Sequence, residues 1–133
     1  LKAGDEVIGT KQDYPNMIQA WKQRALRDGI IYTQISFDFP MEDDDAMVSA
    51  FEKAITPKTK ILHLTHIINW IGQILPVKKI AQMAHRRGLE VIVDGAHSFG
   101  LLDFKIPDLE CDYFGTSLHK FLSAPIGSGM LWI

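Results

Sequence analysis

The sequence predicts an α/β fold in which three layers, α/β/α, enclose a mainly parallel sheet. Short apolar segments alternate along the chain with segments of helical spacing, a pattern typical of parallel sheets that carry helices on both faces. The run 91–93 is apolar and β-branched, and it ends in an acid, Asp94. A second run, 113–115, leads into the polar segment 116–120. Both runs are typical of buried parallel strands that deliver functional groups at their carboxyl ends.

The first third of the chain predicts a strand, a helix and a strand. Residues 6–10 form the first apolar run, and Pro15 suits the first turn of the helix that follows. From 16 to 28 the apolar residues follow helical spacing, and Gly29 is a helix stop. Residues 30–37 mix Ile, Tyr, Thr and Phe, which favours a strand.

The rest of the chain repeats this alternation. The acidic cluster 42–45 precedes a helix, and we interpret it as a charged helix start rather than a metal site. A third strand, 60–65, has the exit loop 66–72, and Pro76 starts a helix that ends in basic residues before Gly88. The strand 89–93 follows, and the glycines at 127 and 129 lead into a last strand that ends at 133.

Composition excludes several classes of protein. The chain has 133 residues, 47% hydrophobic and 23% charged, with a net charge of −2, which gives no reason to expect nucleic acid or an anionic membrane as partner. Cys111 is the single cysteine, so no intrachain disulfide forms, and we expect no metal site. No apolar run has membrane-spanning length, and a cytoplasmic location is the default expectation.

Both ends of the sequence fall inside expected structure. The chain opens on Leu1, next to a turn that enters the first strand, and it closes within the last strand. We expect one partial cofactor-binding domain over residues 1–133, truncated at both ends.

Chemically useful side chains follow two neighbouring strands. Asp94 and His97 come after one strand, and Ser117, His119 and Lys120 come after the next. Ligands of open α/β sheets bind outside the carboxyl ends of the strands. An acid and an amine are also what pyridoxal phosphate requires, because the amine closes a Schiff base and the acid keeps the ring nitrogen protonated. Each residue alone has an ordinary structural interpretation, such as a helix cap for Asp94 or a solvated lysine for Lys120.

The order and spacing of these motifs resemble the class V aminotransferase family of fold-type I pyridoxal-phosphate enzymes. That family includes cysteine desulfurases and isopenicillin N epimerase-like proteins, and the resemblance is to the central part of the large domain. Its most specific motifs here are Val-Asp-Gly-Ala-His-Ser-Phe-Gly at 93–100 and Ser-Leu-His-Lys at 117–120. Weaker matches occur at 4–8, 13–15, 56–60, 65–72 and 76–77.

The resemblance implies roles for six residues. Lys120 forms the internal aldimine with pyridoxal 5'-phosphate, and Asp94 pairs with the pyridinium nitrogen. His97 takes a position near the phenolic oxygen of the ring. Ser117 and His119 match positions that help to hold the phosphate, and Asn69 matches one near the phenolic oxygen or the substrate carboxylate.

Other polar and aromatic residues receive less specific interpretations. Thr65 and His66 end the third strand at the same sheet edge as Asp94, and His66 either supports the loop or touches a ligand. We assign Trp70 and Trp132 to packing. His63 lies within a strand and is interpreted as structural, and Cys111 as a buried small residue.

The resemblance leaves the reaction open. His97 replaces the glutamine that desulfurases usually carry, and this difference favours the epimerase-like and aminotransferase branches. A cysteine desulfurase or lyase is the alternative, because the mobile cysteine of that group lies downstream of the lysine, beyond residue 133. A non-catalytic α/β scaffold that has kept the motifs is the third possibility. A nicotinamide enzyme is disfavoured, since no Gly-x-Gly-x-x-Gly follows the first strand.

Further expectations concern the whole protein. The resemblance implies a small amino-acid substrate and a homodimer whose partner subunit lends residues to the site. It places the phosphate loop and the ring-stacking residue before residue 1, and the arginine for the substrate carboxylate after residue 133. We therefore expect the isolated 133 residues to be inactive.

Overall fold

The computed structural model describes all 133 residues and contains six strands, three α-helices and one short 3-10 helix. In chain order these elements are β1 (Glu6–Thr10), α1 (Pro15–Asp28), β2 (Ile31–Ile35), α2 (Asp44–Ala54), β3 (Thr59–Thr65), α3 (Val77–His85), β4 (Glu90–Asp94), η1 (Ile106–Leu109), β5 (Tyr113–Ser117) and β6 (Gly129–Trp132). No helix is both long enough and apolar enough to cross a membrane.

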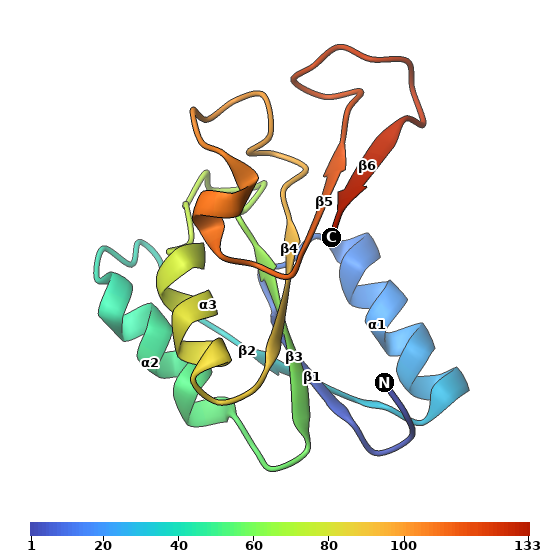
Figure 1. Ribbon diagram of the computed structural model, residues 1–133, viewed down its shortest axis with the longest axis vertical. Helices are drawn as coiled ribbons and strands as arrows, with labels where there is room; N and C mark the ends of the chain where they lie inside the picture. Colours follow the sequence, from blue (N-terminus) through green and yellow to red (C-terminus); the bar gives the residue numbers. More distant parts are fainter.

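The strands form one sheet in the order β2-β1-β3-β4-β5-β6. All neighbouring pairs are parallel except β5 and β6, which are antiparallel. Helix α1 covers one face of the sheet, and α2 and α3 cover the other (Figure 1). The predicted three-layer α/β/α architecture with a mainly parallel sheet is therefore confirmed.

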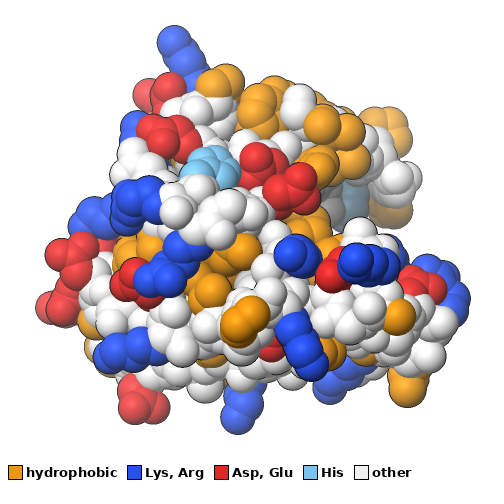
Figure 2. Space-filling view, turned by 60° about the horizontal axis from the view of Figure 1, so that its bottom comes forward, with side chains coloured by type: hydrophobic (Ala, Val, Ile, Leu, Met, Phe, Trp, Pro, Cys, Tyr) orange, Lys and Arg blue, Asp and Glu red, His pale blue; other side chains and the backbone are white.

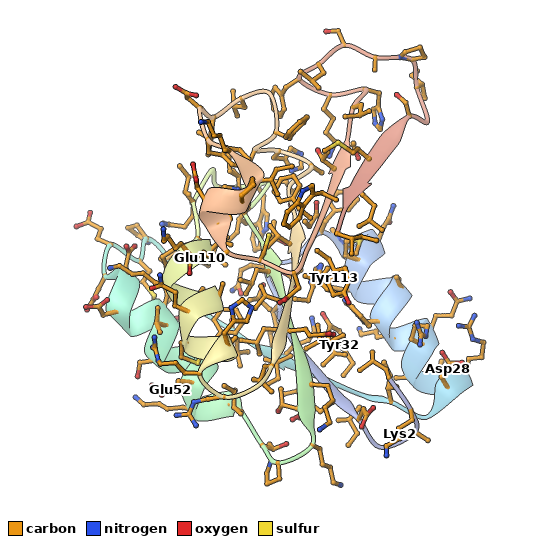
Figure 3. The ribbon with its side chains drawn as sticks, in the orientation of Figure 1. Lys2, Asp28, Tyr32, Glu52, Glu110 and Tyr113 are labelled. Carbon is orange, nitrogen blue, oxygen red and sulfur yellow. The ribbon has the colours of Figure 1, made fainter.

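The two faces of the sheet bury unequal cores. A cluster of 19 buried residues fills the side of α2 and α3, and includes Phe51, Ile80 and Phe114. The side of α1 holds a cluster of only four, namely Val7, Trp21, Ile30 and Ile61. Tyr32 packs against this smaller cluster between the sheet and α1 (Figure 3).

The helix ends follow the sequence. Helix α1 starts at Pro15 and ends at Gly29, whose φ of 70° is the left-handed conformation that glycine adopts without strain. Helix α2 is capped by Asp43, whose carboxylate accepts hydrogen bonds from the backbone N–H groups of Asp45 and Ala46. The acidic cluster is therefore a helix start, as expected.

The outer surface matches the balanced composition. On the face shown in Figure 2, Lys and Arg side chains are interspersed with Asp and Glu side chains, and no area of one charge dominates. Most of these charges are exposed, as in the ion pairs Lys78–Glu110 and Arg87–Glu52, and such pairs stabilise a fold only weakly.

Candidate active site

A cavity of about 620 Å³ lies at the carboxyl ends of β4 and β5, on the face of the sheet that α1 covers. Its walls come from the start of α1, from the ends of β4, β5 and β6, and from the turn that joins β5 to β6. Four of the six predicted site residues line it, namely Asp94, His97, Ser117 and Lys120. The sheet edge predicted from the sequence is therefore where these side chains meet.

Asp94 is the last residue of β4 and the only carboxylate that lines the cavity. Its Oδ1 accepts a hydrogen bond from the backbone N–H of Ala96 at 2.9 Å, and its Oδ2 accepts none from the protein. The chain then passes over the ring of Phe114, so closely that a Cβ on Gly95 would lie 1.8 Å from Cζ of that ring. This close approach fixes the path that the backbone takes after Asp94, at the end of β4.

Lys120 and His97 are in direct contact inside the cavity. Nζ of Lys120 lies 3.1 Å from Nε2 of His97. Burial lowers the pKa of His97, the charge of Lys120 lowers it further, and Asp94 acts in the opposite direction. At neutral pH the imidazole is therefore uncharged, and in the tautomer with its hydrogen on Nδ1 its Nε2 accepts a hydrogen bond from the amine of Lys120.

Tyr14 forms a wall of the cavity that the sequence analysis did not assign. It immediately precedes α1, and Nζ of Lys120 lies 5.5 Å from the centre of its ring. An aromatic face at this distance from an ammonium group attracts it. The pattern Tyr-Pro at a helix start was visible in the sequence, but only the fold places that ring opposite Lys120.

Two predicted site residues lie outside the cavity. His119 is exposed, and its Nδ1 lies 3.4 Å from the backbone oxygen of Ser128. Asn69 is also exposed and lines a smaller hollow with Lys11, Asp13, Pro15, Ile18 and Trp70. The roles proposed for both residues stay predictions.

One aromatic prediction was wrong, and the interpretations of Trp132 and Cys111 agree with the structure. Trp70 is 65% exposed rather than packed in the core, because the loop after β3 carries it outward; its indole N–H donates to the backbone oxygen of Gln12. Trp132 does pack against the larger core cluster. Cys111 is buried, and burial raises the pKa of its thiol to about 11.

The arrangement combines an amine, an imidazole and a free carboxylate oxygen in one partly aromatic cavity. An amine in a protected site can attack an aldehyde carbon, and a carboxylate can hold a protonated ring nitrogen. The unpaired Oδ2 of Asp94, the amine of Lys120 and the hydroxyl of Ser117 are the donor and acceptor set that pyridoxal phosphate requires.

Comparison with known proteins identifies the family. A sequence model of the family Aminotransferase class-V matches residues 1–133. The chain belongs to this family. Its members depend on pyridoxal phosphate, and a solved structure of a C-DES variant contains glycine covalently linked to that cofactor.

Two curated relatives illustrate the range of this family. The isopenicillin N epimerase of Amycolatopsis lactamdurans is 34% identical over 132 residues, which cover 98% of this chain and 33% of the relative. A probable cysteine desulfurase of Halalkalibacterium halodurans is 37% identical over 133 residues, which cover 99% of this chain and 32% of the relative. The chain thus spans about a third of the length of these relatives.

Solved structures agree in fold. The complex of the cystine C-S lyase C-DES with its product cysteine persulfide matches with a TM-score of 0.91 and 31% identity, over 100% of this chain and 36% of that one. The cysteine desulfurase CsdA of Escherichia coli matches with a TM-score of 0.85 and 26% identity, over 99% of this chain and 32% of that one.

Proposed function

We propose that this chain is the cofactor-binding part of a pyridoxal-phosphate enzyme that acts on a small amino acid. The observation that carries the proposal is the meeting of Lys120, His97 and Asp94 in one cavity. When bound there, the cofactor supplies an aldehyde that condenses with amines and a ring that withdraws electrons from the carbon next to the amine.

The residues of the chain then have distinct tasks. Lys120 would supply the amine that holds the aldehyde group of the cofactor, and it would move a proton at the α-carbon of the substrate. His97, 3.1 Å from that amine, accepts a hydrogen bond from it and so orients it. Asp94 holds a proton on the ring nitrogen through its free Oδ2, because an ionised carboxylate and a protonated nitrogen stabilise each other. Tyr14 closes the cavity with an aromatic surface and helps to exclude water.

The polar residues around the ring belong to the same proposal. Ser117 lines the cavity and can donate a hydrogen bond to a phosphate oxygen. His119 and Asn69, which lie outside the cavity as described above, are proposed to contact the phosphate and the phenolic oxygen or substrate carboxylate, respectively. Each of these roles is tested by alanine substitution, with cofactor affinity as the readout.

For the reaction itself, we favour an aminotransferase or an epimerase-like activity. His97 stands where desulfurases usually carry glutamine, and one relative is named as an isopenicillin N epimerase. Cysteine desulfuration or a related lyase reaction is the alternative, which a 37% identical probable desulfurase supports. Cys111 is no candidate for a desulfurase nucleophile, because its raised pKa leaves little thiolate.

The first experiment is the visible spectrum of the protein at its natural full length with pyridoxal phosphate, before and after borohydride. We expect an absorbance band that borohydride reduction converts into a stable adduct on the peptide containing Lys120. Lys120→Ala should abolish the adduct, whereas Lys53→Ala, a change at an exposed lysine of α2, should leave it intact. Labelling spread over surface lysines, or no band at all, would overturn the proposal in favour of a non-catalytic scaffold.

A second experiment separates the two reactions. Incubation of the cofactor-loaded protein with cysteine releases a persulfide or sulfide only in a desulfurase or lyase. Racemisation or keto-acid formation from other amino acids, without sulfur release, supports the favoured assignment.

The whole protein is proposed to form a homodimer. Large apolar side chains are exposed around the loops near the cavity, including Leu101, Phe121 and Ile126. Light scattering on the full-length protein measures the mass, and a monomer would refute this part of the proposal.

A further inference from the structure

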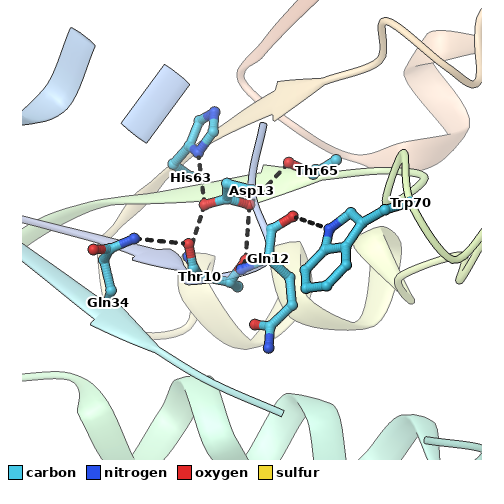
Figure 4. Close-up of polar contacts among 7 residues, drawn as sticks. All are labelled: Thr10, Gln12, Asp13, Gln34, His63, Thr65 and Trp70. Atoms are coloured by element: carbon cyan, nitrogen blue, oxygen red, sulfur yellow. Dashed lines mark hydrogen bonds and ion pairs between the residues drawn. The ribbon is translucent and has the colours of Figure 1, made fainter. Parts of the chain in front are cut away.

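A buried polar cluster lies beside the cavity, between the carboxyl ends of β1 and β3. At its centre is Asp13, whose side chain is fully buried (Figure 4). Its carboxylate accepts hydrogen bonds from the backbone N–H of Thr10 at 2.7 Å, from the hydroxyl of Thr10 at 2.9 Å and from the hydroxyl of Thr65 at 2.8 Å. A fourth contact joins its Oδ2 to Nδ1 of His63 at 3.3 Å.

His63 is the only basic residue that contacts Asp13. Because a carboxylate only accepts hydrogen bonds, Nδ1 of His63 carries the hydrogen in this contact. The imidazole also packs edge-on against Trp21, with ring centres 6.0 Å apart. Asp13 and Trp21 therefore fix the orientation of a ring that has no solvent exposure.

The second nitrogen of this ring has no partner. Nε2 of His63 is buried and makes no hydrogen bond within the chain. A buried polar atom without a partner costs free energy, so native structures normally supply one. His63 lines the same cavity as Asp94 and Lys120. The unpaired nitrogen therefore belongs to the wall of the cofactor site, although His63 is not part of the family motifs identified above.

The strand register places His63 next to Asp94. Thr65 is the direct partner of Asp94 across β3 and β4, and His63 is the partner of Ile92. His63 and Asp94 are thus diagonal neighbours on the face of the sheet that α1 covers. Side chains on diagonal neighbours of one sheet face can meet directly or through one water.

We propose that His63, held through Nδ1 by Asp13, is a positioning residue that donates from Nε2 to Asp94, directly or through one bound water. A donor beside a carboxylate favours its ionised form. His63 then keeps Asp94 ionised and oriented toward the ring nitrogen, much as outer partners orient the ligands of metal sites.

This proposal rests on the proposed function for its purpose, but its central contact can be tested without cofactor. In full-length protein labelled with 15N-histidine, Asp94→Asn should shift the ring-nitrogen signals of His63, assigned with His63→Gln. The asparagine keeps an oxygen for the N–H of Ala96 but has an NH2 group in place of Oδ2, and this group cannot accept a hydrogen bond from His63. Asp112→Asn is the matched control, because Asp112 contacts His85 at 3.0 Å and should shift His85 alone. Unchanged His63 signals in Asp94→Asn would overturn the proposal.

A second measurement uses cofactor labelled with 15N in its ring. His63→Phe keeps a ring against Trp21 but removes both nitrogens, so we expect the ring nitrogen of the cofactor to move toward its unprotonated shift. Cofactor affinity should fall about tenfold, the typical effect of losing a hydrogen bond to a charged group. His63→Gln, which retains a hydrogen-bond donor, should restore much of the protonated ring-nitrogen shift and much of the cofactor affinity.

The two proposals fail in different ways. If the proposed function is wrong, the wild-type protein gives no adduct on Lys120, while the histidine signals still report on the contact between His63 and Asp94. If His63 has only a packing role, the wild type binds the cofactor and His63→Phe leaves the ring-nitrogen shift unchanged. That second result would overturn the role proposed for His63.

Discussion

The buried residue His66 makes the stability of this protein depend on pH. His66 follows β3, is 5% exposed and packs edge-on against Phe104, with ring centres 5.1 Å apart. Its Nδ1 is buried without a partner, and burial lowers the pKa of His66 to about 4. His66 is therefore neutral in the native protein, whereas in the unfolded chain it titrates near its ordinary value of about 6.5.

We predict that this histidine contributes to acid sensitivity between pH 6.5 and pH 4. In that range the unfolded chain binds a proton that the native protein does not, so the free energy of unfolding falls as the pH falls. The loss amounts to about 3 kcal/mol and is complete below pH 4, where both states are protonated.

The measurement is urea unfolding at a series of pH values. His66→Gln should make the free energy of unfolding less dependent on pH between pH 6.5 and pH 4, whatever its effect on stability at pH 7. His119→Gln, a change at an exposed histidine that contacts no carboxylate, should leave the slope nearly as it is. An unchanged slope in His66→Gln would show that burial does not control the titration of His66.

A second prediction about a single residue concerns Gly95, which follows Asp94 and lies against the core residue Phe114. A Cβ at this position would lie 1.8 Å from Cζ of Phe114, a fully buried ring that Phe99 and Phe104 hold in place. Gly95→Ala should therefore destabilise the protein by about 1–3 kcal/mol, the usual cost of overpacking a core. Gly115→Ala is the control, because nothing lies within 4 Å of its added Cβ. Equal midpoints in denaturant for the two variants would contradict this explanation.

At the scale of elements, the sequence predicted those parts of the fold that depend on local patterns. Helix α1 could be predicted because Pro15 and Gly29 mark its ends, and α2 because the acids at 42–45 suit a helix start. The strand β1 has the expected boundaries, and the boundaries of the other strands lie within two residues of the expected ones; β5 extends to Ser117. The connection from β4 to β5 contains only η1, a short element without helical periodicity that the sequence analysis did not foresee.

The candidate site could be predicted only where it follows strand ends. Asp94 ends β4 and Ser117 ends β5, and His97 and Lys120 each follow three residues later. Parallel strands bring such positions to one edge of the sheet. Tyr14 reaches the cavity from a different layer, across the space between α1 and the sheet. The contact of Asp13 with His63 joins residues 50 positions apart, and no local pattern reveals such a pairing.

At the scale of the whole molecule, the two faces of the sheet are held unequally. Five buried residues of α3 face the larger core, among them Ile80 and Met83, whereas Trp21 is the only buried residue of α1. Helix α1 nevertheless begins beside Asp13, which contacts His63, and beside Tyr14, which lines the cavity. The helix with the smaller apolar contact is therefore the one that positions one wall of the cavity.

This asymmetry gives a prediction for the full-length protein. Trp21→Ala removes the main apolar contact of α1, a change of a kind that typically costs about 3–5 kcal/mol. Amide hydrogen exchange should accelerate in α1, while α3 stays protected, because stability differs between parts of a structure. Pyridoxal phosphate should also bind more weakly, since Tyr14 and the contact of Asp13 with His63 depend on the position of α1. Leu26→Ala, at a residue 91% exposed in the same helix, should change neither readout. Equal acceleration of α1 and α3 in Trp21→Ala would mean that the two layers unfold as one unit, and the cofactor site would then share the stability of the whole core.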